Sequence, residues 1–331
     1  MHSVSNSIPA VDREAVFLDY IAIARPDHAT KHIFIIPGII LAVALVHPAL
    51  SQNTAVTIAL GILSAGLIAC ANYTINEWLD RSCDAFHPEK SKRTAVNKAL
   101  SPRIVFFQYA LLAVAGLGLA TLVGNSFSAT SFIFFLSGVI YNVKPFRTKD
   151  VAYLDVISES VNNPLRLMLG WAMVSPNTLP PSSLVIAYWA GGAYLMAAKR
   201  LSEYREIAAG PHLGLLRKYR RSFLHYTAEN LTVSCFLYAI LSAFAAAVFL
   251  VKYRIEYVLA MPLMAAMFAL YLSLSMRAGS VAQKPERLFT ERKLVALVAL
   301  NVLTLIVLTY VDIPELNMLS VPYLIQLPGN K

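Results

Sequence analysis

Long apolar runs separated by short polar stretches dominate the sequence. Nine such runs lie near residues 33–50, 54–75, 104–123, 128–143, 151–174, 183–198, 230–251, 256–276 and 293–311. A helix needs about 20 apolar residues to cross the hydrocarbon core of a bilayer, and the runs approach this length, the fourth and sixth by extending into their flanks. The pattern predicts an all-α, polytopic membrane protein with nine transmembrane helices and no soluble second domain.

The two ends of the chain are more polar than the part between them. Residues 1–31 lack the apolar core of a signal peptide and are expected to form a cytosolic arm, with an amphipathic surface helix around residues 16–23. Arg25-Pro26 is expected to end that helix, because proline disfavours helical backbone at the preceding residue. Residues 32–311 form the predicted nine-helix domain around a central cavity open to the cytosolic side, and residues 312–331 form an extracytoplasmic tail.

The distribution of charge gives the expected orientation. Only 14% of the residues are charged, against about 25% in soluble domains, while the net charge is +9. All 28 Lys and Arg residues but Arg166, Lys252, Arg254 and Lys331 lie in the arm or in the loops after the even-numbered runs. The positive-inside rule then places the N-terminus in the cytosol and the C-terminus outside. This topology accounts for the excess of positive charge, so we expect no nucleic-acid partner. The protein is expected to lie in a plasma membrane, such as the inner membrane of a bacterium.

An acidic stripe follows the second run, in the stretch NEWLDRSCDAFHPEKSKR from Asn76 to Arg93. Asn76, Asp80 and Asp84 recur every four residues, so a helix places them on one face. Magnesium prefers oxygen ligands, takes one or two carboxylates from the protein and completes its shell with water and substrate phosphates. The alternative is a solvated helix end, but carboxylates at membrane depth are costly and mark functional sites. The stripe therefore predicts a magnesium site.

Positive charge follows the stripe directly. Lys90, Lys92 and Arg93 can meet the phosphates of a metal-bound substrate. Among the histidines, which show no metal-ligand spacing, only His87 is retained as a substrate-binding candidate. Cys83 is expected to face away from Asp80 and Asp84 and receives no role.

Two further polar groups flank the fifth run. Tyr141, Lys144, Arg147 and Lys149 precede it, and are either phosphate ligands or interface anchors. Within the run, Asp155, Glu159, Asn162 and Arg166 form one stripe on an otherwise apolar helix. Lipid cannot solvate this stripe, so it either lines a polar cavity or pairs internally. Asp155 is counted among the substrate-binding candidates.

A third group closes the sixth run. Lys199, Glu203 and Glu206 fall at helical spacing, and Lys199, Arg200 and Glu203 are candidate substrate ligands. The basic residues from Arg217 to Arg221 are expected to attract anionic lipid headgroups. The chain contains no Walker loop, dinucleotide fingerprint or nucleophile elbow.

With these residues in view, the chain resembles the UbiA superfamily of intramembrane prenyltransferases. That superfamily has nine transmembrane helices and an acidic motif N-D-x-x-D-x-x-x-D after the second, which here reads Asn76-Glu77-x-x-Asp80-x-x-x-Asp84. The resemblance implies that Asp80 and Asp84, assisted by Asn76, hold Mg²⁺ on the diphosphate of a polyprenyl donor. It also implies that Arg93, Lys144 and Tyr141 neutralise the leaving diphosphate.

The chain departs from this pattern in ways that leave the reaction open. Lys199 and Arg200 precede Glu203 where the superfamily usually begins its second acidic motif with Asp. The Lys-Arg-x-x-Glu element that begins at Lys199 and the His87-Pro88-x-Lys90 element are similar to those of one branch of the superfamily. That branch transfers phosphoribose from phosphoribosyl diphosphate to a polyprenyl phosphate. Prenyl transfer to an aromatic or other small acceptor is the first hypothesis and phosphoribosyl transfer the second. An ion-coupled transporter ranks third, since transporter sites lie near the midplane rather than at cytosolic helix ends.

Overall fold

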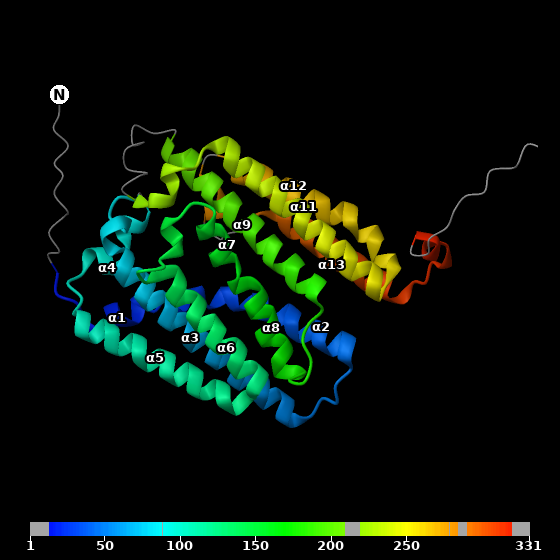
Figure 1. Ribbon diagram of the computed structural model, residues 1–331, viewed down its shortest axis with the longest axis horizontal. Coiled ribbons are helices and arrows are strands. Elements are labelled where there is room, and N and C mark those ends of the chain that lie inside the picture. Colours follow the sequence, from blue (N-terminus) through cyan, green and yellow to red (C-terminus); the bar gives the residue numbers. More distant parts are fainter. Residues whose placement is uncertain (1–12, 88, 209–218, 278, 284–289, 320–331) are drawn as a thin grey trace, which may run out of the picture.

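The protein is described by a computed structural model covering residues 13–319 except 88, 209–218, 278 and 284–289 (Figure 1). Within these residues the chain is helical and contains no β-ladder, only an isolated bridge between Glu14 and Ala99. The all-α class expected from the sequence is confirmed for this part of the chain. The first 12 residues of the arm, the last 12 of the tail, and Arg217 and Lys218 lie outside the described residues.

Each apolar run contains a helix or two consecutive helices. In chain order these are α2 (Ile36–Val46), α3 (Gln52–Asp84), α5 (Pro102–Val123), α6 (Asn125–Asn142), α7 (Leu154–Ser160) with α8 (Asn162–Val174), α9 (Ser182–Ala208), α11 (Ala228–Tyr253), α12 (Met261–Ser275) and α13 (Arg292–Tyr310). The 3₁₀ segment η5 (Ile255–Ala260) leads directly into α12. The break between α7 and α8 falls just before Pro164, which has no N–H to donate to Ser160.

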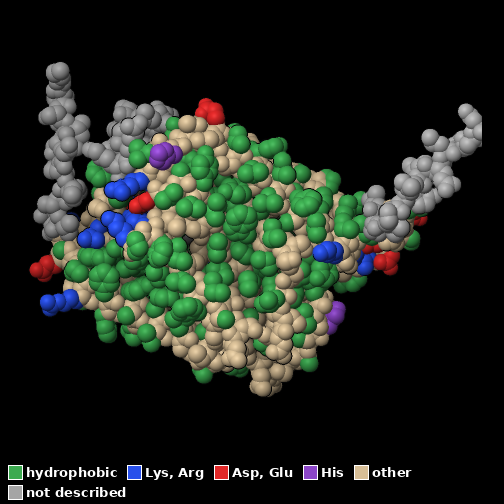
Figure 2. Space-filling model, viewed as in Figure 1, with side chains coloured by type: hydrophobic (Ala, Val, Ile, Leu, Met, Phe, Trp, Pro, Cys, Tyr) green, Lys and Arg blue, Asp and Glu red, His purple; other side chains and the backbone are tan. Residues whose placement is uncertain are grey.

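Five of the described helices are long and apolar enough to cross a membrane, counting η5 and α12 as one. They are α3, α5, α11, η5 with α12, and α13, and a sixth is added if the bent pair Phe17–His28 and His32–Val46 forms one span. The runs of α6, α7 with α8, and α9 are more polar, and several of their polar residues line the cavity described below. Figure 2 shows hydrophobic side chains over the middle of the molecule and charged ones mainly at its two ends. The count of nine spans remains a prediction.

The described part of the arm forms the expected amphipathic helix. α1 spans Phe17–Ile23 and buries Tyr20 and Ile23 beside α3 and the short α4 (Thr94–Asn97). The Tyr20 hydroxyl accepts a hydrogen bond of 2.9 Å from the backbone N–H of Ser101. Phe17 and Leu18 are exposed, which leaves an apolar face for the membrane surface.

Glycines allow α2 and α8 to pack with their backbones in contact. A Cβ atom on Gly38 would lie 2.0 Å from the Leu167 carbonyl oxygen, and one on Gly170 would lie 2.1 Å from that of Ile35. Small residues permit this close approach between membrane helices, where van der Waals packing replaces the hydrophobic effect as the driving force. The contact fixes the position of α8 against the first apolar run.

Two groups of buried side chains flank a central cavity. One group joins α9, α11 and α12, and the other joins α2, α3, α6 and α8. The cavity takes lining residues from both groups, including Leu195 and Tyr271 from the first and Ala69 and Phe134 from the second. Its volume of about 520 Å³ lies within the range of small-molecule sites.

Candidate functional site

The acidic stripe lines the central cavity as expected. α3 continues past its apolar run to Asp84, so that Asn76, Asp80 and Asp84 occupy successive turns of one helix. All three line the cavity. Cys83, which was expected to face away, lines it too, because the cavity is wide enough to reach the neighbouring position on the helix.

Asp80 is held between two basic residues that follow α6. Its carboxylate lies 2.6 Å from Nζ of Lys149 and 2.9 Å from Nη2 of Arg147. Lys149 also donates to Oδ1 of Asn142, which accepts a second hydrogen bond from Asn76. Burial lowers the pKa of Lys149 to about 8 although Asp80 opposes the shift.

The structure places Lys144 differently from the expectation. Lys144 is exposed and is not among the cavity-lining residues, because the chain turns away before the 3₁₀ turn η3 (Thr148–Asp150) brings Lys149 inward. Arg147, immediately before this turn, has a left-handed backbone with φ of 31°. The resemblance implied Lys144 as the residue of this basic group that neutralises diphosphate, whereas the structure places Lys149 on the cavity wall instead.

Asp84 pairs with Arg93 at 2.6 Å across the loop that leaves α3. Glu77 also holds this loop in place, because its buried carboxylate accepts a hydrogen bond of 3.3 Å from the backbone N–H of Ala95. Both Asp84 and Arg93 line the cavity, as expected.

His87 and Lys90 occupy the turn between these groups. Nδ1 of His87 accepts hydrogen bonds from the backbone N–H groups of Glu89 and Lys90, so this buried ring organises the loop and does not line the cavity. Burial, followed by the charge of Lys90, lowers the pKa of His87 to about 4. Lys90 lines the cavity, donates to the Tyr219 hydroxyl and lies 3.5 Å from Glu203. Burial lowers the pKa of Lys90 to about 8 against the opposing charge of Glu203.

A second carboxylate group surrounds Arg200. This arginine is 1% exposed and places Nε 3.1 Å from Asp155, Nη1 2.9 Å from Glu203 and Nη2 2.7 Å from Glu159. Asp155 also accepts hydrogen bonds from Ser222 and Tyr226. Both interpretations left open for this stripe apply: Asp155 and Glu159 pair internally, while Glu159, Asn162 and Arg166 line the cavity.

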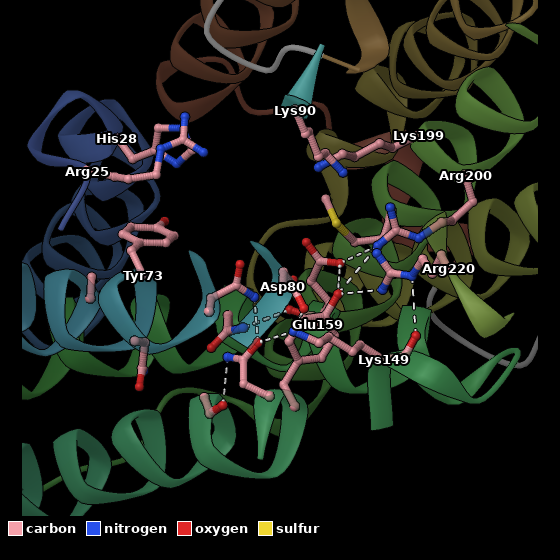
Figure 3. A pocket seen from close by; sticks show the side chains of 18 of the residues that line it. Arg25, His28, Tyr73, Asp80, Lys90, Lys149, Glu159, Lys199, Arg200 and Arg220 are labelled. Carbon is pink, nitrogen blue, oxygen red and sulfur yellow. Dashed lines mark hydrogen bonds and ion pairs between the residues drawn. The ribbon is translucent and has the colours of Figure 1, made fainter. Parts of the chain in front are cut away.

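Tyr141 and Arg220 connect the two carboxylate groups. The Tyr141 hydroxyl donates to Glu159 at 2.7 Å and accepts from Nη2 of Arg220 at 2.7 Å, while Nε of Arg220 donates to the backbone carbonyl of Lys149 (Figure 3). Arg220 was assigned only a surface role from the sequence, yet it lines the cavity. Its loop follows residues 209–218 and its position depends on tertiary packing, which spacing does not encode.

The cavity is strongly basic and offers one set of oxygen ligands for a hard cation. Ten Lys and Arg residues line it against four Asp and Glu residues. Among the described residues, no group of three His, Cys, Asp or Glu side chains is arranged to hold a metal ion. The carboxylates of Asp80 and Asp84 with the amide oxygen of Asn76 fit magnesium, which takes few protein ligands and shares its shell with substrate phosphates. The group around Arg200 does not fit a metal, because Asp155 and Glu203 do not line the cavity and all three of its carboxylates converge on one buried arginine.

Comparison with known proteins identifies relatives over most of the chain. The model of the UbiA prenyltransferase family matches residues 33–310. A protoheme IX farnesyltransferase of Alkalihalophilus pseudofirmus is 25% identical over 230 residues, which are 66% of this chain and 72% of that protein. An uncharacterized protein of Sinorhizobium fredii is 30% identical over 110 residues, and this match spans 33% of the chain but only 21% of that relative.

Solved structures share the fold. A UbiA homolog from Archaeoglobus fulgidus bound to DMAPP and Mg²⁺ superposes with a TM-score of 0.66, and the same homolog bound to GPP and Mg²⁺ with 0.64. These matches cover 89% and 88% of this chain and all of the archaeal one, at 20% sequence identity. At this identity the likeness establishes a common architecture.

Proposed function

The chain belongs to the UbiA prenyltransferase family and is a multi-pass integral membrane protein, and on that premise we propose that it is a Mg²⁺-dependent transferase acting on a polyprenyl diphosphate. The prenyl group would pass to an aromatic or other small acceptor bound in the same cavity. The archaeal structures with prenyl diphosphates and Mg²⁺ support this choice of donor. The single observation that carries the proposal is the position of Asp80 and Asp84 beside Lys149 and Arg93 on the cavity wall.

Breaking the allylic C–O bond leaves negative charge on the departing diphosphate. A magnesium ion held by Asn76, Asp80 and Asp84 would supply a Lewis acid for this charge. Lys149, Arg93 and Lys90 lie on the same cavity and would place fixed positive charge on the phosphate oxygens. Because ion pairs and hydrogen bonds hold these groups in place before substrate binds, they stabilise developing charge without reorganising.

Lys199 is the member of the third group that is suited to contact a donor. It lines the cavity from α9 beside Lys90 (Figure 3). Arg200, expected from the sequence to bind substrate as well, also lines the cavity, but its guanidinium is paired with Asp155, Glu159 and Glu203. Glu203 and Asp155 therefore serve to fix Arg200 rather than to bind substrate. The apolar part of the lining, including Leu195 and Met196, accommodates the prenyl group.

Phosphoribosyl transfer to a polyprenyl phosphate is the second candidate. The excess of ten basic over four acidic lining residues favours it, because phosphoribosyl diphosphate and a lipid phosphate bring more negative charge than a prenyl diphosphate and a neutral acceptor. The ion-coupled transporter gains no support from the site and is disfavoured by the family assignment.

We also infer the orientation from the charge distribution. The arm and the loops that carry Lys90, Lys149 and Arg220 would face the cytosol, so that the cavity would receive water-soluble substrates from that side.

Diphosphate release by the purified protein tests the proposal and separates the two reactions. The protein is offered geranylgeranyl diphosphate with candidate acceptors, and separately phosphoribosyl diphosphate with a polyprenyl phosphate. We expect turnover with Mg²⁺, none with EDTA, recovery on adding Mg²⁺ back, and loss of activity in Asp80→Asn and Asp84→Asn proteins that insert and fold normally. Full activity of Asp84→Asn in EDTA would refute the metal site, and exclusive use of phosphoribosyl diphosphate would establish the second candidate.

A further inference from the structure

The wall of the central cavity carries a carboxylate that the donor site described above does not use. Among the described residues, four Asp and Glu side chains line the cavity, namely Asp80, Asp84, Asp150 and Glu159. Asp80 and Asp84 form the proposed magnesium site, and Asp150 lies 2.9 Å from Nε of Arg147. Glu159 of α7 is therefore the remaining acidic group on this part of the wall.

The Glu159 carboxylate is held in place by one of its two oxygens. Oε2 accepts hydrogen bonds from the Tyr141 hydroxyl and from Nη2 of Arg200, each at 2.7 Å. No group in the described part of the chain donates a hydrogen bond to Oε1. An ionised carboxylate accepts on both oxygens, so Oε1 is available to a molecule in the cavity.

Glu159 also differs from the two other carboxylates around Arg200. Its side chain is 26% exposed, whereas those of Asp155 and Glu203 are 0% and 2% exposed and do not line the cavity. Two further cations pair with these buried carboxylates, Arg220 with Asp155 and Lys90 with Glu203, each at 3.5 Å. The negative charge of Glu159 is therefore the one of the three that reaches the cavity.

A short path of contacts joins Glu159 to the donor site. The Tyr141 hydroxyl accepts a hydrogen bond from Arg220, and Arg220 donates to the Lys149 carbonyl at 3.2 Å. Nζ of Lys149 lies 2.6 Å from Asp80, and Figure 3 shows Glu159 near both of them. A donor whose diphosphate lies against Asp80 and Lys149 therefore brings its reacting carbon into the part of the cavity that Glu159 lines.

In both candidate reactions this carbon becomes positively charged. The bond between the carbon and the diphosphate oxygen breaks, and its electron pair leaves with the diphosphate. The carbon is then part of an allylic cation in prenyl transfer, or of a ribosyl oxocarbenium ion in phosphoribosyl transfer. An electron pair of the acceptor forms the new bond, and an acceptor that carries a proton at that atom releases it to water.

The lining of the cavity is unfavourable for such a carbon. Ten Lys and Arg residues line it, and like charges repel strongly where water is partly excluded. A carboxylate beside the carbon lowers the energy of the cation, as a carboxylate of glycosidases does for an oxocarbenium ion. Because Tyr141 and Arg200 already hold Glu159, its charge would act without reorganisation.

We propose that Glu159 is a catalytic residue that stabilises the positive charge developing on the donor carbon. Its role is electrostatic, so it forms no bond to the substrate and takes no proton. The proposal rests on the proposed function, since it assumes that the donor diphosphate lies against Asp80. It applies to both candidate donors, because each forms a cation at the carbon that leaves the diphosphate.

Pairs of probes that differ in charge test this role by binding alone. The full-length protein in detergent, with Mg²⁺ and inorganic pyrophosphate, is titrated near neutral pH with geranylamine against geraniol. It is titrated separately with an iminoribitol against the corresponding anhydroribitol. Both amines are protonated and mimic the charged carbon. We expect at least one cation to bind at least about tenfold more tightly than its neutral twin, and the preferred cation identifies the donor class.

A matched pair of variants assigns the preference to Glu159. Glu159→Gln keeps the size and the acceptor oxygen of the side chain, and it should abolish the preference for the cation while pyrophosphate still binds. Asp150→Asn removes the same charge from another position on the cavity wall and should retain the preference.

Kinetics with the donor so identified provide a second measurement. Glu159→Gln should lower kcat by about 100- to 1,000-fold, the range for removing one group that stabilises a transition state. KM for the donor should stay within about threefold of the wild-type value, because the interaction forms mainly in the transition state. A merely structural role would instead lower thermal stability and pyrophosphate affinity together with kcat.

Three results would overturn this role while the proposed function stands. They are equal binding of both cations and their neutral twins by a protein that binds pyrophosphate, a cation preference that persists in Glu159→Gln, and a loss of pyrophosphate affinity in that variant as large as the loss of kcat. Failure of the wild-type protein to bind pyrophosphate with Mg²⁺ would refute the proposed function itself. If Glu159→Gln does not fold, Glu159→Asp replaces it. That variant withdraws the charge by one methylene group and should lose part of the preference, and an unchanged preference would refute the role.

Discussion

The ammonium of Lys149 lies 2.6 Å from the Asp80 carboxylate, and the loop that carries it holds Lys144 on the surface instead. The two lysines are five positions apart and precede the same apolar run. Only Lys149 is buried, with 3% exposure, and only Lys149 lines the cavity. The pair of lysines therefore offers a matched test of the donor site.

Replacing Lys149 by Gln is expected to weaken binding of the donor diphosphate by about 10- to 150-fold, because a charge-assisted contact worth about 1.5–3 kcal/mol is removed. Lys144→Gln should change affinity less than twofold. Pyrophosphate affinity with Mg²⁺, measured by calorimetry, checks both. Equal losses in the two variants would show that net charge rather than position matters.

Donor affinity is expected to fall with pH because of Lys90. Burial lowers the pKa of Lys90 from the ordinary value of 10.5 to about 8. Its side chain is therefore charged below about pH 8 and loses its charge above that pH. Above about pH 8, affinity should decrease by up to tenfold per pH unit for Lys90 and by a similar factor for Lys149, whose pKa is also about 8. The fold itself should become more stable over this window, because the unfolded chain then binds more protons.

The Lys90→Gln protein should bind the donor weakly at every pH and should lack the decrease in affinity that deprotonation of Lys90 causes. The Lys92→Gln protein, changed at an exposed neighbouring position, should retain that decrease. His87, with a pKa of about 4, stays neutral throughout and adds no step near neutrality. Pyrophosphate affinity measured from pH 6 to 9.5 tests this, and a Lys90→Gln profile identical in shape to the wild type would contradict the assignment.

Adjacent residues of α9 are expected to separate stability from binding. Arg200→Met removes the ion pairs that Asp155, Glu159 and Glu203 make with one buried arginine and should destabilise the protein by about 3–5 kcal/mol. Lys199→Gln should destabilise the protein less than Arg200→Met does and should weaken donor binding. Thermal unfolding in detergent and pyrophosphate titration distinguish the two, and an Arg200→Met protein as stable as the wild type would refute the structural role.

Labelling tests the orientation of the chain. In a Cys83→Ser background, a cysteine at Lys92 is expected to react only with reagent on the cytosolic side, and one at Glu315 only with reagent outside. Both positions are exposed. Reaction of the Lys92 position from outside would reverse the orientation and place the cavity opening on the other face.

The sequence predicted what depends on local spacing. The four-residue repeat of Asn76, Asp80 and Asp84 placed the stripe on one face of α3, and proline and apolar length located the helices. It did not select Lys149 over Lys144, since that choice depends on how a loop turns. The same holds for Arg200, whose three carboxylates come from α7 and α9.

The enclosure of Arg200 constrains how the protein is made. Asp155 and Glu159 are synthesised about 40 residues before the arginine that neutralises them. Released alone into lipid, α7 would carry two uncompensated carboxylates, which the bilayer disfavours strongly. We therefore expect the nascent α7–α8 segment to stay beside the insertion machinery until α9 emerges, so that the order of synthesis determines when this half of the cavity closes.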